Sequence, residues 1–200
     1  MLPEATLVID HFHAIRLASE AVNDVRRRVQ QDTTGHRGRK GDPLYGIRRL
    51  LLMTWRNLNE RGWERLRAGL AAGDRDGEIA AVWLARELLS EVYAAPDLAA
   101  AKRRLTVFFQ HAADANVPEL TRLARTIDRW HREVLAYHQT GGASNGPTEA
   151  VNLLIEKIRR IGHGYRNFNN YRRRLLLGCG IQWTTLPTRR IRGRQPAFIA

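Results

Sequence analysis

The sequence contains a single cysteine and no long apolar run, and these two shortages exclude several classes of protein. Cys179 is the one cysteine among 200 residues, so no disulfide can form within the chain and a reducing compartment is expected. The longest unbroken apolar runs, such as residues 80–85, are far shorter than the roughly 20 residues that span a bilayer. Pro3, Glu4 and Asp10 interrupt the N-terminal segment, which does not resemble a signal peptide. These features predict a cytoplasmic protein without a membrane partner.

The motifs of three common chemistries are also missing. The sequence has no glycine-rich phosphate loop after a strand and suggests no Ser-His-Asp arrangement. His11 and His13 stand close together, but no Cys or His pair at standard spacing completes a zinc site with them. His131 and His138 lie seven positions apart on one predicted helix, too far apart to ligate one ion together. Zinc is therefore not expected.

Positive charge is abundant, and it is unevenly placed. The chain has 33 Lys and Arg against 20 Asp and Glu, a net charge of +13. From residue 141 onward there are eleven basic residues and two acids, so +9 of this charge falls in the last sixty residues. A local field of this kind suits a polyanion, and nucleic acid is the first candidate. Arg outnumbers Lys thirty to three, but a GC-rich genome gives that bias without selection for binding.

Apolar residues recur every three to four positions over most of the chain, which is the spacing of helices. A helix is expected over about residues 12–31, and residues 44–139 are expected to be helical, with breaks at residues 71–77 and at Pro96. The aromatic side chains of this block are predicted to lie in the core rather than to bind a cofactor or stack on bases. The loop over residues 32–43 is basic, and it is interpreted either as simply mobile or as a phosphate contact.

One short segment, residues 5–9, has the composition of a strand. It is apolar and rich in β-branched side chains, and it stops at Asp10. The pattern predicts a buried strand with Asp10 at its carboxyl end, where open α/β sheets place their chemistry. No convincing second strand follows, so this strand is expected to be the remnant of a sheet.

The most informative stretch is residues 144–168. It opens with turn residues and continues as a periodic helix, in which Pro147 suits the first position and Asn145 or Gly146 the cap. Glu149 then falls in the first turn, where the helix dipole favours a negative charge. The stretch is typical either of a capping acid on an ordinary amphipathic helix or of a metal-dependent enzyme acting on nucleic acid. The opposite face of the helix carries three basic residues, Lys157, Arg159 and Arg160.

Asp10 and Glu149 together suggest a specific chemistry. Two-metal phosphodiester chemistry needs carboxylates that converge from separate elements on the two ions. Asp10 after a strand and Glu149 on a helix would supply two such ligands, and their hard oxygens suit Mg²⁺ or Mn²⁺.

Three segments carry a family resemblance: LVIDHFHAIRLASEAVNDVRRR, TTGHRGRKGDPLYGIRRLLL and SNGPTEAVNLLIEKIRRIGHGYRNFNNYRRRLLLGCGIQW. They resemble the C-terminal part of DDE-type transposases, in the insertion-sequence family often called the ISL-three group. The resemblance implies an RNase H-like catalytic core interrupted by a helical insertion, an Asp, Asp, Glu triad and Mg²⁺ or Mn²⁺. In that family pattern Asp10 matches the second Asp and Glu149 the Glu, with Asn145 and Asn152 at flanking motif positions.

The chain also departs from the family pattern. The first catalytic Asp is expected on a strand before residue 1, and a zinc-binding and helix-turn-helix region is expected earlier still. Glu156 stands where the family more often has a basic residue, which reduces the positive face. The resemblance therefore implies a transposase fragment that is inactive in DNA cleavage and strand transfer as an isolated chain. The alternative is a non-catalytic DNA-binding or inhibitory remnant that associates with full-length transposase.

The expected fold is mainly α: a truncated RNase H-like DDE core with one residual strand and a large helical insertion. Residues 1–12 are assigned to the strand, 13–140 to the insertion, 141–182 to the Glu149 helix and a following core helix, and 183–200 to a basic, poorly ordered tail. DNA is the expected partner, with self-association or full-length transposase as further possibilities. DNA contacts are expected from seven basic residues, Lys157, Arg159, Arg160, Arg166, Arg172, Arg189 and Arg190.

Overall fold

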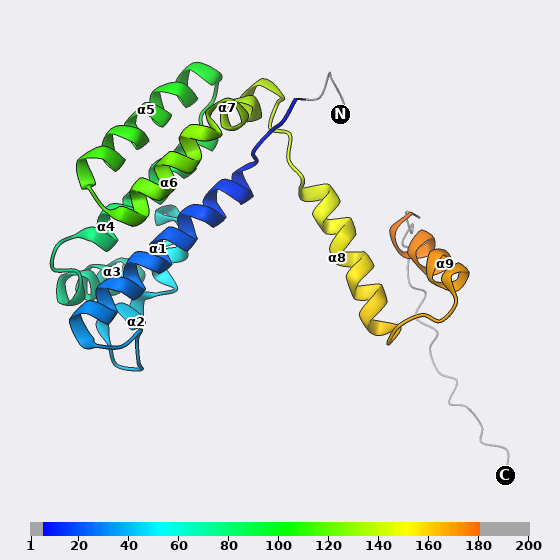
Figure 1. Cartoon of the computed structure of the whole chain (residues 1–200), viewed down its shortest axis with the longest axis horizontal. Coiled ribbons are helices and arrows are strands. Elements are labelled where there is room, and N and C mark those ends of the chain that lie inside the picture. The colour runs from blue at the N-terminus through cyan, green and yellow to red at the C-terminus, as the bar shows by residue number, and fades with distance from the viewer. Residues whose placement is uncertain (1–5, 181–200) are drawn as a thin grey trace, which may run out of the picture. The chain divides into compact units, whose positions relative to one another are not determined.

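The computed structural model describes residues 6–180, and the chain divides into two compact units, Met1–Ser144 and Asn145–Ala200 (Figure 1). Every regular element within residues 6–180 is a helix, so the prediction of a mainly α fold is confirmed. In that part of the chain, no helix is both long enough and apolar enough to cross a membrane.

The helices follow one another with short connections. The first unit contains α1 (His11–Thr34), α2 (Pro43–Ile47), the 3-10 helices η1 (Leu50–Leu52) and η2 (Trp55–Asn57), α3 (Glu60–Gly73), α4 (Glu78–Tyr93), α5 (Leu98–Ala115), α6 (Pro118–Arg129) and α7 (His131–Gln139). The second unit contains α8 (Gly146–Ile161) and α9 (Phe168–Cys179).

Helix α4 forms the centre of the first unit. It packs against both α1 and α5, while α6 packs against α1 and α5, and α7 packs against α5 and α6. Several faces of α4 are buried, as expected for a helix surrounded by others. Most aromatic residues of the helical block belong to the core, as predicted: Trp83, Tyr93 and Phe108 are buried. Five more are partly buried and pack against it, namely Trp55, Trp63, Phe109, Trp130 and Tyr137.

Capping residues explain where several helices begin. Asp10, Asn59 and Asp97 precede α1, α3 and α5, and each side chain accepts the backbone N–H of the residue three positions later. Helix α1 ends at Gly35, whose φ of 73° is the left-handed conformation that glycine adopts readily. The helix predicted over residues 12–31 is therefore confirmed, and it continues to Thr34.

A buried ion pair attaches the two 3-10 helices to α4. Arg86 and Glu87 pair with one another, and they are 5% and 1% exposed. Arg86 Nη2 donates to the carbonyl of Leu52 at 2.8 Å, and the backbone N–H of Trp55 donates to Glu87 Oε2 at 3.1 Å. Burial raises the pKa of Glu87 and lowers that of Arg86. The pair therefore fixes the chain that connects α2 to α3.

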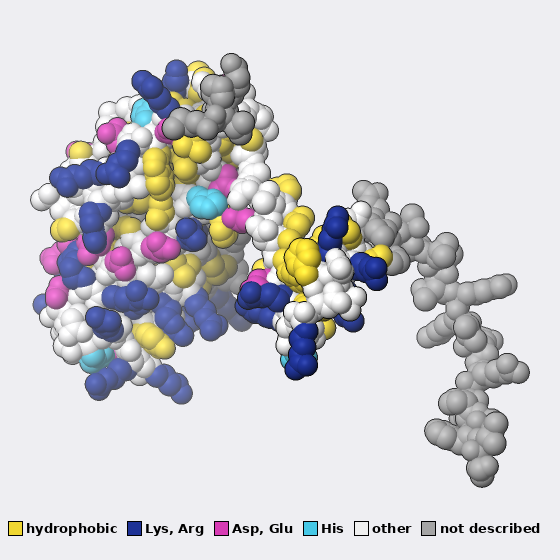
Figure 2. Space-filling view, turned by 45° about the vertical axis from the view of Figure 1, so that its right-hand side comes forward, with side chains coloured by type: hydrophobic (Ala, Val, Ile, Leu, Met, Phe, Trp, Pro, Cys, Tyr) yellow, Lys and Arg dark blue, Asp and Glu magenta, His cyan; other side chains and the backbone are white. Residues whose placement is uncertain are grey.

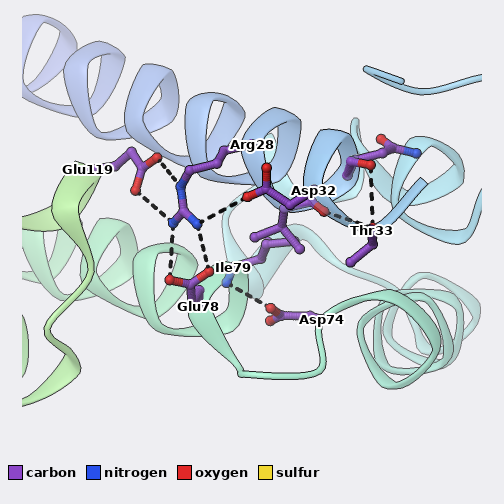
Figure 3. A network of polar contacts seen from close by, with 9 residues as sticks. Arg28, Asp32, Thr33, Asp74, Glu78, Ile79 and Glu119 are labelled. Carbon is purple, nitrogen blue, oxygen red and sulfur yellow. Dashed lines mark hydrogen bonds and ion pairs between the residues drawn. The ribbon is translucent and has the colours of Figure 1, made fainter. Parts of the chain in front are cut away.

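A second polar cluster joins α1, α4 and α6 (Figure 3). The guanidinium of Arg28 lies between the carboxylates of Glu78 and Glu119. Both glutamates stand in the first turn of their helices, where the helix dipole favours a negative charge. Asp74 completes the start of α4 by accepting the backbone N–H of Ile79 at 3.1 Å.

The strand predicted over residues 5–9 is not present in residues 6–9, and Ala5 lies outside the described residues. Residues 6–10 have no regular secondary structure, and residues 6–180 contain no strand with which they pair. A strand needs a neighbour to satisfy its backbone groups. Here the backbone N–H of Ile9 instead donates to the carbonyl of Glu133 in α7, at 3.1 Å. The β-branched composition of this segment was therefore a misleading signal.

The second unit is a pair of packed helices, α8 and α9, joined by residues 162–167. Gly178 of α9 lies so close to α8 that a Cβ atom there would come within 2.7 Å of Ile158 Cδ1. None of residues 145–180 is buried, and the apolar side chains of Leu153 and Phe168 are 75% and 73% exposed. The described part of this unit therefore has no buried core of its own.

Candidate metal ligands and nucleic-acid interface

Asp10 is nearly fully buried at the start of α1, with 6% of its surface exposed. Its Oδ1 accepts the backbone N–H of His13 at 3.0 Å and lies 2.7 Å from the Nδ1 of the same residue. The first contact is an N-cap, which satisfies one of the free N–H groups at the start of a helix. Asp10 therefore has a structural role in this fold, whatever else it does.

The residues around Asp10 hold its backbone in place from two other helices. Ile9 is bound through its N–H to α7, and its carbonyl accepts the hydroxyl of Tyr93 in α4 at 3.1 Å. Burial raises the pKa of Tyr93, and the negative charge of Asp10 raises it further, so the phenol stays protonated as a donor. Partial burial lowers the pKa of His11, while Asp10 opposes that shift and Arg86 adds to it. The carboxylate of Asp10 thus lies on a well-anchored segment.

The carboxylate oxygens of Asp10 are the ligand type that Mg²⁺ or Mn²⁺ prefers. Within residues 6–180, no group of three or more His, Cys, Asp or Glu lies together in a way that could hold a metal ion. Asp10 is therefore a carboxylate of the right chemical type that belongs to no such group among the described residues.

Glu149 lies in the first turn of α8, as predicted. Its backbone N–H donates to the carbonyl of Asn145 at 2.9 Å, and its side chain is half-buried. Asn145 is the N-cap residue by position, but its side chain makes no capping hydrogen bond, and Pro147 stands at the helix start. Asp10 belongs to the first unit and Glu149 to the second.

Five of the seven basic residues predicted to contact DNA are described, and all five are exposed. Arg159 forms an ion pair with Glu156 at 2.8 Å, which neutralises part of its charge. The remaining two, Arg189 and Arg190, lie outside the described residues together with the predicted basic tail. The exposed five are Lys157, Arg159 and Arg160 on α8, Arg166 in the connection, and Arg172 on α9.

Sequence reasoning missed two further exposed cations, Arg173 and Arg174, although the run from Arg172 was a visible signal. The guanidinium of Arg174 lies over the ring of Tyr165 at 5.8 Å. That ring stacks on Tyr171 at 5.0 Å, and the Tyr165 hydroxyl donates to the carbonyl of Ile158 at 3.1 Å. Tyr165 is thus occupied in packing the connection between α8 and α9. The described part of the second unit carries seven cations and two acids. Figure 2 shows Lys and Arg side chains at the surface of this unit.

Comparison with known proteins assigns the family. A family model for DDE transposases of the ISL3 group, described as a transposase, matches residues 1–175. The transposase for insertion sequence element IS1557 of Mycobacterium tuberculosis strain CDC 1551 / Oshkosh is 27% identical, over 82% of this chain and 40% of that protein. The protein of the same name from strain ATCC 25618 / H37Rv gives the same values. The chain thus spans 40% of the length of these relatives, and no solved structure matches it. Because the family model covers most of its length, the chain belongs to the ISL3 family of DDE transposases.

Proposed function

We propose that this chain takes part in the transposition of an insertion sequence, and that its second unit contacts the DNA backbone. The observation that carries this proposal is the excess of exposed cations in a member of a transposase family. Residues 145–180 carry seven cations against two acids, and one of those acids is already paired with Arg159. Exposed Arg and Lys side chains bind phosphates without reading base sequence, so this surface suits positioning on DNA rather than recognition of a site.

The proposal assigns metal-ligand roles to Asp10 and Glu149. Asp10 is supported by its anchored position at the start of α1, and both residues are supported by their place in the family motifs. Divalent ions bound to such carboxylates would stabilise the charge that develops on the attacking and leaving oxygens during DNA cleavage and strand transfer. The contribution of this chain is to fix the direction of each carboxylate, and the contacts around Ile9 serve that purpose for Asp10.

DNA binding is tested with the 200-residue chain and short duplexes of unrelated sequence. The logarithm of the binding constant is expected to fall linearly with the logarithm of salt concentration, by about 0.9 for each phosphate contacted. Lys157→Ala combined with Arg160→Ala removes two cations of α8 that form no ion pair within residues 6–180. It should reduce that slope by about 1.8, equally for all sequences. Lys102→Ala combined with Arg103→Ala removes the same charge from exposed positions of α5 and is the matched control. Absence of binding at low salt would contradict the proposal.

Catalysis is tested separately, with transposon-end DNA and Mg²⁺ or Mn²⁺. The sequence matches two of the three carboxylate motifs of the family, so we expect the 200-residue chain to bind DNA without cleaving it. Loosely positioned metals cost orders of magnitude in rate, since this chemistry depends on positioning and charge stabilisation. Metal-dependent cleavage that Glu149→Gln abolishes would show that the chain completes its own active site. Inhibition of a full-length transposase by the chain would instead favour the remnant role.

A further inference from the structure

We propose that the loop between α1 and α2, residues 35–41, is a second contact for the DNA backbone, located on the first unit. The proposal rests on the proposed function in one respect, namely that the polyanion is taken to be DNA. It extends the expected interface from the basic second unit to a separate surface of the helical unit. We call this surface the basic loop, and its charged side chains are Arg37, Arg39 and Lys40.

The basic loop has a defined backbone. Gly35, Gly38 and Gly41 have φ angles of 73°, 120° and 105°, which side-chain-bearing residues rarely adopt. A Cβ atom on Gly38 would come within 2.7 Å of Gln30 Oε1 and 2.9 Å of Tyr45 Cδ2. Glycine is therefore required at this position both by its conformation and by the lack of space.

A buried amide anchors the loop from beneath. Gln30 is 1% exposed, and its Nε2 donates to Asp42 Oδ2 at 3.0 Å. The same oxygen accepts the backbone N–H of Arg39 and lies 3.5 Å from the Nδ1 of His36. The carboxylate of Asp42 is thus used to fix the loop backbone. Since the loop is ordered before binding, little conformational entropy is lost when it meets a ligand.

The cations of the basic loop are available to an external partner. Arg37, Arg39 and Lys40 are exposed, and none of the three forms an ion pair with any residue in the range 6–180. Further cations stand close by, and Figure 2 shows Lys and Arg side chains gathered over the lower part of the first unit, where Figure 1 places α2 and α3. Arg65 of α3 lines a groove of about 360 Å³ together with Gly41, and Arg48 lies 3.8 Å over the ring of Tyr45.

The chemistry of this surface favours a phosphate backbone over an acidic protein. Protein interfaces are centred on buried aromatic or apolar anchors, with arginine often beside them. The groove beside the basic loop includes Pro43 and Ile47 in its lining, but the basic loop itself, residues 35–41, contains only glycine, His36 and the three cations. Cations spread along a glycine-rich loop, with no apolar anchor, match the regularly spaced charges of DNA.

The test is a salt titration of DNA binding by the full 200-residue chain carrying Arg37→Ala, Arg39→Ala and Lys40→Ala. If all three side chains contact phosphates, the slope of log affinity against log salt is smaller by about 2.7 in this variant. The ratio of the affinity of the unmodified chain to that of the variant then falls about fortyfold between about 50 and 200 mM salt. The control variant Lys102→Ala, Arg103→Ala, Arg125→Ala removes the same charge from exposed positions of α5 and α6 and should leave the slope nearly unchanged. Equal slopes for the two triple variants would overturn the inference.

A second variant tests the loop geometry without removing a charge. Gly38→Ala forces the loop backbone away from Gln30 and Tyr45 and should weaken DNA binding severalfold. Asn116→Ala places alanine at another position of positive φ, 49°, between α5 and α6, and should leave DNA binding unchanged. Thermal unfolding establishes that both variants are folded. Unchanged binding by folded Gly38→Ala would overturn the claim that the loop is pre-ordered for DNA. If the unmodified chain binds no duplex, the proposed function is contradicted. If the chain binds DNA but the loop variants bind equally well, only the inference about the loop is overturned.

Discussion

Arg28 donates two parallel hydrogen bonds to Glu119, from Nε to Oε1 at 2.7 Å and from Nη2 to Oε2 at 3.0 Å, although 91 positions separate the residues. The same guanidinium donates to both carboxylate oxygens of Glu78, at 3.0 and 3.1 Å. The planar fork of an arginine allows this double bidentate arrangement, which a lysine cannot reproduce. One side chain of α1 thereby fixes the first turns of α4 and α6 (Figure 3).

Replacement of Arg28 should destabilise the first unit. Arg28→Ala leaves Glu119, which is 6% exposed, without its cation, and we expect the free energy of unfolding to fall by about 1–3 kcal/mol. Arg28→Lys keeps the charge but loses the planar fork. Its free energy of unfolding should therefore lie between those of the parent chain and Arg28→Ala. Urea unfolding followed by tryptophan fluorescence reports this unit, since four of the five tryptophans lie in it. Arg27→Ala, at an exposed neighbouring position, should cost much less, and equal losses at Arg27 and Arg28 would contradict the argument.

Stability should depend on pH through Glu119. The hydrogen bonds from Arg28 lower the pKa of Glu119 below its ordinary value of 4.5, and this effect outweighs burial, which raises it. The unfolded state therefore binds a proton first as the pH falls. The stabilisation is present above about pH 4.5 and is lost as the pH drops through the folded pKa. Glu119→Gln should flatten the decline in unfolding free energy below pH 4.5, and an unchanged decline in this variant would contradict the assignment.

Hydrophobic spacing was sufficient to predict most of the helices. The apolar positions Ile15, Val22 and Val29 recur on one face, and that face is what α1 buries against α4 and α6. The break near Pro96 and the helix that begins after Asn145 were likewise visible, because proline and turn residues act locally. Local chemistry determines these features, so a single sequence carries them.

Tertiary partners were not predictable in the same way. Nothing in the local pattern distinguishes Arg28 from Arg27, since the partners of Arg28 lie 50 and 91 positions away and are brought to it by the packing of three helices. The segment before Asp10 had strand-like composition, but a strand also requires a partner, and residues 6–180 contain none. At the candidate site, Asp10 was predicted to end a strand, because the spacing of Asp10 and His13 was not recognised as a capping pattern. This spacing is in fact that of a helix cap.

The contact between α2 and α3 depends on glycine. A Cβ atom on Gly69 would come within 2.6 Å of Ile47 Cγ2, and one on Gly73 within 2.5 Å of Leu44 Cγ. Overpacking in Gly69→Ala should lower the unfolding free energy of the first unit by about 1–3 kcal/mol. The better helix propensity of alanine offsets about 1 kcal/mol of this loss. Gly46→Ala in α2 meets no atom within 4 Å and should be neutral or stabilising. Calorimetric melting compares the two variants, and a stabilising Gly69→Ala would show that α2 moves away from α3 at little cost.

Asp10 has a capping role that is separable from its proposed role as a metal ligand. Asp10→Ala removes the acceptor for the backbone N–H of His13, and the loss of such a cap costs about 0.5–2 kcal/mol of stability. Asp10→Asn keeps a side-chain oxygen that serves as an N-cap equally well, so its unfolding free energy should stay close to that of the parent chain. Urea unfolding of the two variants tests the cap alone. Equal losses in both would show that the charge of Asp10, rather than its acceptor oxygen, stabilises α1.

Comparison of Asp10→Ala with Asp10→Asn also separates the effect on stability from the effect on metal binding. An amide oxygen is a much poorer ligand for Mn²⁺ than a carboxylate, so Asp10→Asn should remove affinity for the ion while leaving the fold intact. Electron paramagnetic resonance of free Mn²⁺ measures this affinity directly on the 200-residue chain, without any need for DNA cleavage. Glu149→Gln should weaken Mn²⁺ binding in the same assay, and Glu156→Gln, on the same helix and paired with Arg159, should not. If Asp10→Asn keeps full Mn²⁺ affinity while Asp10→Ala merely loses stability, then Asp10 is a capping residue and not a metal ligand in this chain.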